Sequence, residues 1–91
     1  MSNYKSRKVG RTEVNGIIVS TAYTNDEGYE TAILDAKNAY PVERYKTKED
    51  AEKGHEKWCI EAKTLTRIKR LGGFGGLVED EEIDIIRRPS A

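Results

Sequence analysis

The sequence predicts an α+β fold, in which a small antiparallel sheet of three to four strands packs on one long helix. A Gly-rich connector and an acidic C-terminal segment follow the helix. Three observations predict this fold: alternating β-branched and aromatic runs at 17–24 and 29–36, the tight-turn pair Asn15-Gly16, and a capped helical pattern that begins near Lys48.

The first strands are predicted from their turns. Asn15-Gly16 favours a two-residue hairpin, so residues 9–14 should pair with the run that begins at Ile17. If the polar residues 25–28 form the next loop, the run 29–36 pairs back on 17–24. The expected pairs are Val19 with Leu34, Thr21 with Ala32 and Ile17 with Ala36, and the other face would carry Ser20, Thr31 and Asp35.

The fourth strand and the helix are predicted from proline and capping signals. Pro41 indicates a short edge strand over 42–46, because proline cannot donate to a ladder. Thr47 can accept from the amide of Asp50, which predicts a helix start near Lys48. Spacings of three and four extend this helix to about Arg70, with one face formed by Ala51, His55, Trp58, Ala62 and Leu65.

Two residues of the predicted helix should determine how it packs on the sheet. Trp58 is predicted at the centre of the core, where replacement by alanine should cost about 3–5 kcal/mol. Gly54 costs about 1 kcal/mol relative to alanine inside a helix, so we expect it to admit a strand residue, a tyrosine, at close range. Residues 72–76 are predicted to cap the helix and then to form a flexible connector.

Length and composition limit the domain organisation and the classes of function. Ninety-one residues make one core, too small for a deep substrate cleft, so a small binding protein is the natural expectation. We divide the chain into a domain at 1–71 and a segment at 72–91 that packs back as a strand or short helix or stays free.

Charge, cysteine content and hydropathy limit the possible partners and the cellular location. Sixteen basic and sixteen acidic residues cancel, which argues against nucleic acid as a partner. The single cysteine forms no internal disulfide, which favours a reducing compartment. No apolar run has the length of a membrane span or of a signal-peptide core, so we expect a soluble intracellular protein without membrane contact.

The inventory of chemical groups predicts no enzyme, no cofactor and no metal site. His55 is the only histidine, and we expect it to be half-buried with its ring bonded to a backbone group. One His and Cys59 are too few for a zinc site. The glycines at 72–76 follow a helix instead of preceding one, which is the wrong order for a phosphate loop.

Charge is segregated along the chain, and this pattern suggests a partner-docking patch. Basic residues near 67–70 are followed by an acidic run at 79–82, with Phe74 between two glycine pairs. Phe74 either covers the core or is presented as an aromatic anchor. The alternative is a solvated charged surface. The candidate partner-binding residues are Phe74, Arg67, Arg70, Glu79, Asp80, Glu81 and Glu82.

Three pieces of the chain carry a resemblance: Ile18-Val19-Ser20-Thr21, Tyr29-Glu30-Thr31-Ala32-Ile33, and Glu43-Arg44-Tyr45-x-Thr47-x-x-Asp50-Ala51-x-x-Gly54-His55. Together they resemble a widespread family of small bacteriophage proteins that has no settled enzymatic role. The resemblance implies a phage origin, location in the host cytoplasm and a strand-rich half followed by a helix. At the level of fold alone, the plan is similar to the phage Thoeris anti-defence protein 1, which sequesters a cyclic signalling nucleotide.

Two functions follow as expectations. The first is a non-enzymatic phage accessory protein that binds a host protein and inhibits or redirects it, with a homo-oligomer as a further option. The alternative is an anti-defence sponge for a cyclic or ADP-ribose-derived nucleotide, in which arginine clamps phosphates and tyrosine stacks on a base. The residues for this alternative are Arg11, Tyr23, Tyr29, Arg44 and Tyr45.

Overall fold

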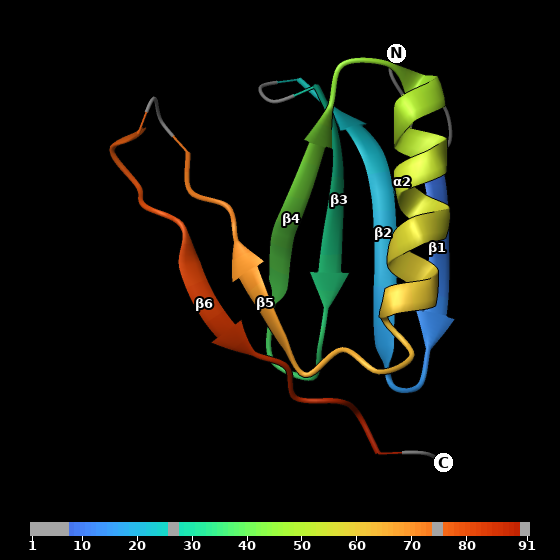
Figure 1. The fold of residues 1–91 in the computed structure, drawn as a ribbon, viewed down its shortest axis with the longest axis vertical. Coiled ribbons are helices and arrows are strands. Elements are labelled where there is room, and N and C mark those ends of the chain that lie inside the picture. Colours follow the sequence, from blue (N-terminus) through green and yellow to red (C-terminus); the bar gives the residue numbers. More distant parts are fainter. Residues whose placement is uncertain (1–7, 26–27, 74–75, 90–91) are drawn as a thin grey trace.

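The computed structural model describes residues 8–25, 28–73 and 76–89. The elements in chain order are β1 (Lys8–Val14), β2 (Ile17–Thr24), β3 (Gly28–Leu34), β4 (Ala39–Tyr45), α2 (Lys48–Glu61), β5 (Arg67–Arg70) and β6 (Glu81–Asp84). The first four strands form an antiparallel sheet in the order β1-β2-β3-β4, and α2 packs across one of its faces (Figure 1). The predicted α+β class is confirmed.

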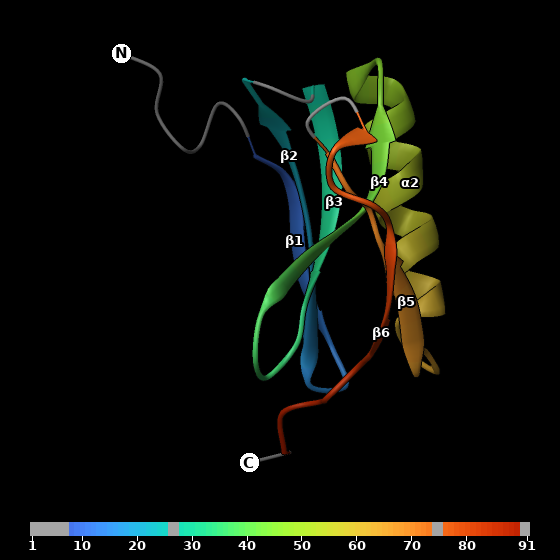
Figure 2. The same cartoon turned by 90° about the vertical axis from the view of Figure 1, so that its left-hand side faces the viewer.

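A second, smaller sheet follows the helix. β5 and β6 pair antiparallel and lie beyond β4 (Figures 1 and 2). The backbone N–H of Leu71 donates to the carbonyl of Pro41 at 2.8 Å, which attaches this hairpin to the β4 edge. Pro41 therefore lies on an edge strand as predicted, although β4 begins at Ala39 and bulges beside Thr31.

The first hairpin is confirmed. Asn15 and Gly16 both take positive φ, at 48° and 86°, which matches the right-handed twist of the strands they join. Val14 pairs with Ile17 across this turn.

The predicted register of β2 against β3 is wrong by one residue. Val19 faces Ile33 and Thr21 faces Thr31, because Gly28 at φ 73° already pairs with Thr24 and belongs to β3, not to the loop. A shift of one residue turns every side chain of a strand to the other face. Thr31 and Asp35 therefore point to the helix side and are buried, and Ala32 and Leu34 take the face without the helix.

The helix is shorter than predicted. Thr47 caps it as expected, with the Asp50 N–H donating to Oγ1 of Thr47 at 3.1 Å, but α2 ends at Glu61 and the stretch to Arg70 includes β5. Ile68 of β5 is 4% exposed and belongs to the core, so burial as a strand residue prevails over the helical spacing. The predicted cap at Gly72 is also wrong, since Gly72 lies after β5 and donates to Oδ1 of Asp80 at 2.7 Å.

The centre of the core is aliphatic. Ile17, Val19 and Ile33 are completely buried, and Val42, Ala62 and Ile68 complete the cluster. Trp58 is only half-buried and packs at the rim of this cluster, because its indole N–H reaches the carboxylate of Glu43. The prediction that Trp58 forms the centre is therefore wrong.

Residues 85–88 form a strap along the lower end of the domain in Figure 1. Its backbone forms hydrogen bonds with three parts of the chain. The N–H of Ile85 donates to the carbonyl of Thr66 at 2.8 Å, and the N–H of Arg88 donates to the carbonyl of Gly16 at 2.9 Å. The carbonyl of Ile86 accepts from the N–H of Ala36 at 2.8 Å. The Arg87 guanidinium donates to the carbonyls of Val14, Asn15, Ala62 and Leu65 at 2.6–3.3 Å. The strap thus ties the first hairpin to the end of α2.

Candidate functional site

A continuous chain of polar side chains runs between α2 and the sheet, and we call it the polar relay. Its contacts are Thr12 Oγ1 to His55 Nε2 at 3.0 Å, His55 Nδ1 to Thr21 Oγ1 at 2.8 Å, Thr21 Oγ1 to Thr31 Oγ1 at 2.6 Å, Thr31 Oγ1 to Tyr45 OH at 3.0 Å, and Tyr45 OH to Glu43 Oε1 at 3.0 Å. The relay thus crosses all four strands of the large sheet under one helix.

The strand register assembles the relay. Thr21 and Thr31 are cross-strand partners on the helix side, and Thr31 in turn faces Glu43. Two glycines make room for the rings. A side chain at Gly10 would meet the His55 imidazole, and one at Gly54 would collide with the Tyr45 phenol. The expectation that Gly54 admits a tyrosine is confirmed.

Hydrogen counting gives the relay a direction. The Tyr45 hydroxyl donates to the Glu43 carboxylate and has no second hydrogen, so its oxygen accepts from Thr31. Thr31 has then used its hydrogen, and it must accept from Thr21. Each hydroxyl from Thr21 onward therefore points toward the carboxylate.

The same counting fixes the tautomer of His55. Thr21 donates to Thr31, so its oxygen accepts the Nδ1 proton of His55. In the neutral ring, Nε2 is then an acceptor, and it receives the hydroxyl of the exposed residue Thr12. The prediction of a half-buried His55 is confirmed, but its partners are hydroxyl groups and not a backbone group.

Glu43 is the acceptor at the end of the relay. Its Oε1 also receives Lys57 Nζ at 2.7 Å and Trp58 Nε1 at 2.8 Å. Burial alone would raise the pKa of Glu43, but the hydrogen bonds from Lys57, Trp58 and Tyr45 and the Lys57 charge outweigh it, and the pKa is lowered. Glu43 therefore stays ionised and fixes the direction of the bonds that lead to it.

The two other titratable groups of the relay are held neutral. Burial raises the pKa of Tyr45 to about 12, with a further contribution from the Glu43 carboxylate. Burial lowers the pKa of His55, and this outweighs the negative charge of Glu56, which acts to raise it. With Thr21 and Thr31 completely buried, the relay positions the helix on the sheet by directional hydrogen bonds.

The relay as a unit was not predicted from the sequence. Thr12, Thr21 and Thr31 each lie in a predicted strand, but their convergence depends on the register. The usable signal was the pair of glycines at 10 and 54, because a glycine inside a strand or helix often marks the close approach of another group.

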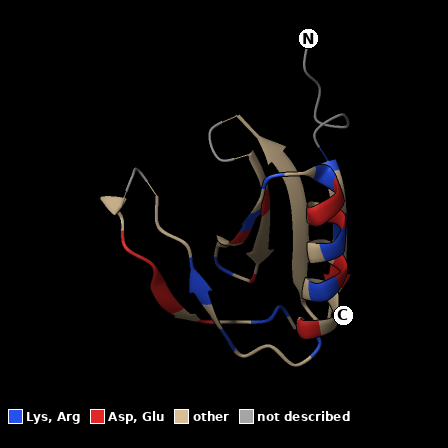
Figure 3. Ribbon diagram, turned by 45° about the horizontal axis from the view of Figure 1, so that its top comes forward, with Lys and Arg blue, Asp and Glu red and all other residues tan. Residues whose placement is uncertain are grey.

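Most of the predicted partner-binding residues gather on the β5–β6 hairpin, where opposite charges face each other (Figure 3). Arg67 bonds Asp84 at 2.8 Å, and Arg70 lies 3.7 Å from Glu81. Glu82 is the cross-strand partner of Lys69. Glu79 and Asp80 precede β6 and are exposed, and Phe74 lies outside the described residues.

The predicted nucleotide-binding residues are divided between the two faces of the sheet. Tyr23 and Tyr29 lie on the helix side with their rings edge to face at 5.1 Å, and Tyr45 is part of the relay. Arg11 and Arg44 alternate to the opposite face, on the outer strands β1 and β4. Arg44 bonds Glu30 at 3.1 Å, so the structure does not bring the five residues together.

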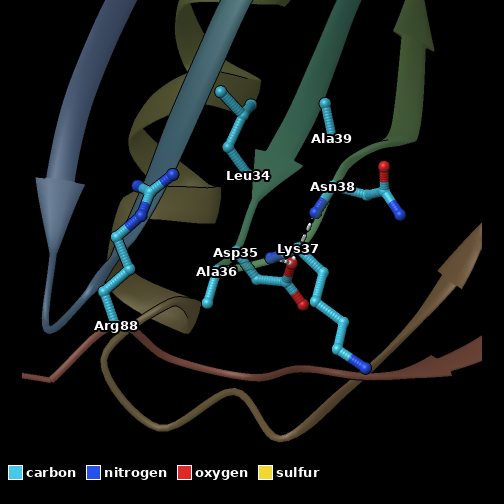
Figure 4. Close-up of a pocket in the computed structure, with 7 residues that line it drawn as sticks. All are labelled: Leu34, Asp35, Ala36, Lys37, Asn38, Ala39 and Arg88. Atoms are coloured by element: carbon cyan, nitrogen blue, oxygen red, sulfur yellow. Dashed lines mark hydrogen bonds between the residues drawn. The ribbon is translucent and has the colours of Figure 1, made fainter.

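One cavity of about 110 Å³ lies between the β3–β4 turn and the strap (Figure 4). It is lined by Leu34, Asp35, Ala36, Lys37, Asn38, Ala39 and Arg88. Burial would raise the pKa of Asp35, but backbone N–H groups of Asn38, Ile86 and Lys37 bond its carboxylate and the pKa is lowered. The carboxylate of Asp35 thus organises the turn.

Two further findings concern metal binding and membranes. Within the described ranges, no three His, Cys, Asp or Glu side chains cluster in a way that could hold a metal ion. In the same part of the chain, no helix is both long enough and apolar enough to cross a membrane.

Comparison of this chain with protein-family models, with curated proteins and with solved structures gave no match.

Proposed function

We propose that this protein is a non-enzymatic phage accessory protein that binds a host protein and inhibits or redirects it. The observation that carries the proposal is the β5–β6 hairpin, which extends away from the helix and the large sheet (Figure 1). Near its far end the side chain of Leu77 is 87% exposed, and that of Val78 is 37% exposed. An exposed aliphatic group on a projecting hairpin is a typical protein-binding anchor.

The charge of the hairpin suggests the kind of partner. Residues 67–84 contain three basic and five acidic side chains, a local net charge of −2. The basic side chains of β5 lie opposite acidic ones of β6, so the surplus acids, including Glu79 and Asp80, lie nearest to Leu77. We therefore infer a partner surface with an apolar depression surrounded by lysine and arginine.

A crosslinking experiment tests this function. A photoreactive amino acid in place of Leu77 should capture one host protein in infected or transformed cells, and a probe in place of Ile60 serves as the control. Ile60 is 67% exposed but lies on α2, away from the hairpin. The identified protein is then purified, and its dissociation constant is measured with the wild type, Leu77→Asp and Ile60→Asp.

The proposal predicts that Leu77→Asp weakens binding of the purified partner at least about tenfold, as for the loss of a central apolar anchor. Ile60→Asp should leave the dissociation constant within about twofold of the wild type. Capture from both probe positions alike, or equal affinity of the two variants, would contradict docking through the hairpin.

One observation favours the sponge alternative. Tyr23 is 43% exposed and its ring packs against Tyr29, which offers an aromatic surface to a base. A thermal-shift screen with cyclic and ADP-ribose-derived nucleotides separates the two functions, because a tight ligand raises the melting temperature. A rise that disappears in Tyr23→Ala would favour the sponge over the protein-binding function.

A further inference from the structure

The outer end of the polar relay has the arrangement of an activated nucleophile, and the proposed function makes no use of it. Oγ1 of Thr12 donates to Nε2 of His55 at 3.0 Å, and the other ring nitrogen, Nδ1, donates to Oγ1 of Thr21 at 2.8 Å. Nucleophilic catalysis by a hydroxyl group requires the hydroxyl itself, an imidazole that can take its proton, and a third group that orients the imidazole. The relay contains all three groups in one chain of contacts.

The imidazole is oriented by a group that is itself fixed. Thr21 is completely buried, and its hydroxyl donates to Thr31, so its oxygen accepts from Nδ1 of His55. This contact keeps the lone pair of Nε2 directed at the Thr12 hydroxyl. Burial lowers the pKa of His55, so the ring is neutral near pH 7 and can accept a proton. Thr21 therefore holds His55 in the orientation that a general base needs.

The Thr12 side chain lies where a second molecule can reach it. Thr12 is exposed, in contrast to the completely buried Thr21 and Thr31. Its strand, β1, is the outer strand of the large sheet and lies beside α2 (Figure 1). Within the described ranges, no strand pairs with the outer side of β1. A small reagent can therefore approach the hydroxyl from the edge of the sheet.

The backbone of β1 places a hydrogen-bond donor next to this hydroxyl. Val14 and Ile17 close the two-residue hairpin as a hydrogen-bonded pair. Because these pairs alternate along an antiparallel ladder, Thr12 also bonds to β2, and the N–H of Glu13 points to the free edge. The N–H of the residue after a nucleophile is a common donor to the oxyanion of acyl transfer. The N–H of Glu13 can stabilise such a charge on an acyl group attached to Thr12.

We propose that Thr12 is a nucleophile for small activated acyl groups, those of thioesters and activated esters, with His55 as its general base. Oγ1 of Thr12 attacks the acyl carbonyl carbon, and its proton passes to Nε2 of His55. The bond from that carbon to the leaving oxygen or sulfur then breaks, and the leaving group takes the proton from His55. The products are an ester on Thr12 and a free alcohol or thiol.

This reaction is separate from binding through the β5–β6 hairpin. The ester uses up the hydroxyl group, so each molecule reacts once, and the reaction marks the chain without turnover. Thr12 lies on β1, at the opposite edge of the large sheet from the hairpin (Figure 1). Failure of the hairpin to bind a host protein would therefore leave the acylation of Thr12 unaffected.

Acetylation of the full chain by p-nitrophenyl acetate tests the proposal. Mass spectrometry after digestion measures the rate at each threonine, and alkaline hydroxylamine separates acetyl esters, which it cleaves, from acetyl-lysine. Thr64 is the internal control, because it is exposed and the single histidine of the chain bonds to Thr12 instead. Thr12 should react at least about 100-fold faster than Thr64, which is the usual contribution of a general base.

Three variants test the role of the imidazole. His55→Gln should lower the rate at Thr12 about 100-fold, because an amide cannot take the proton at neutral pH. The matched control Glu61→Gln, at an exposed position of the same helix, should leave this rate within about twofold of the wild type. Thr12→Ser keeps a hydroxyl group and should still be acetylated at position 12.

The comparison within the wild type requires no substitution, and circular dichroism checks that every variant is folded. Equal rates at Thr12 and Thr64 in the wild type would overturn the proposal. So would a folded His55→Gln protein that is acetylated at Thr12 as fast as the wild type, or a loss of equal size in Glu61→Gln.

Discussion

The two halves of the contact between α2 and the large sheet are stabilised by different forces. At the middle of the helix, His55 takes part in a chain of side-chain hydrogen bonds that ends at Glu43. At the C-terminal end, Ala62 packs in a cluster with Ile17 and Ile33, and these three side chains are completely buried.

The comparison separates two roles: one part of the contact supplies most of the folding free energy, and the other sets where the helix lies on the sheet. Burial of hydrocarbon is non-directional and contributes most of the stabilisation, at about 25 cal/mol per Å². Hydrogen bonds contribute less net free energy, but they require fixed distances and angles. The aliphatic half should therefore control stability, and the polar relay should control the placement of the helix on the sheet.

The largest effect is expected in the aliphatic half. Ile33→Ala should lower the free energy of unfolding by about 2–5 kcal/mol, because it removes buried methyl groups and leaves a cavity. Urea denaturation measures the change. The control Ile60→Ala, at a side chain that is 67% exposed, should alter stability by no more than about 0.5 kcal/mol. Equal losses in both variants would refute an aliphatic centre at Ile33.

A smaller effect is expected from breaking the relay at its middle. Thr31→Val keeps the shape of the side chain but leaves the Thr21 hydroxyl without its acceptor, and should cost about 1–3 kcal/mol. The double variant T21V/T31V removes both hydroxyls of that bond, so its cost should be clearly less than the sum of the two single changes. Simple additivity would show that the relay does not act as a unit.

The pH dependence is expected to be smaller still. Burial lowers the pKa of His55 below its unfolded value near 6.5, so the unfolded state binds the proton more readily. The stability from this group is fully present above that pH and is lost as the pH falls through the folded pKa. Urea denaturation from neutral to mildly acidic pH should show this loss, and His55→Gln should remove that part of the slope. If the dependence of stability on pH is unchanged in His55→Gln, the loss of stability at acidic pH comes from carboxylates and not from His55.

The smallest effect is spectroscopic. His55 is the only histidine, so nitrogen chemical shifts of a single imidazole report its tautomer. At neutral pH the shifts should identify Nδ1 as the protonated nitrogen, since Thr21 must accept from it. Glu43→Gln should alter this tautomer preference, because the amide no longer fixes the direction of the relay. A ring protonated on Nε2 in the wild type would contradict the hydrogen count.

The features that were predicted correctly depend on neighbours in sequence. The Asn15-Gly16 turn, the Thr47 cap and the close approach at Gly54 follow from local conformational preferences. The β2–β3 register was missed because it depends on whether Gly28 belongs to the loop or to the strand. A shift of the strand pairing by one residue decides which side chains are buried.

The other misses come from tertiary packing. The helix pattern continued through Ile68, but this residue gains more from the core as part of β5. The relay was missed because it joins residues 43 positions apart through a register that the sequence leaves open. The partner-binding and nucleotide-binding residues remain predictions, and the structure gives only their positions.

The Arg87 guanidinium has a consequence for how this protein is made in the cell. It bonds carbonyl groups of the first hairpin and of the segment after α2, which have been translated long before residue 87 leaves the ribosome. Until then those carbonyl groups have to bond to water in place of the guanidinium. The lower end of the molecule should therefore close late, after the arginine has emerged.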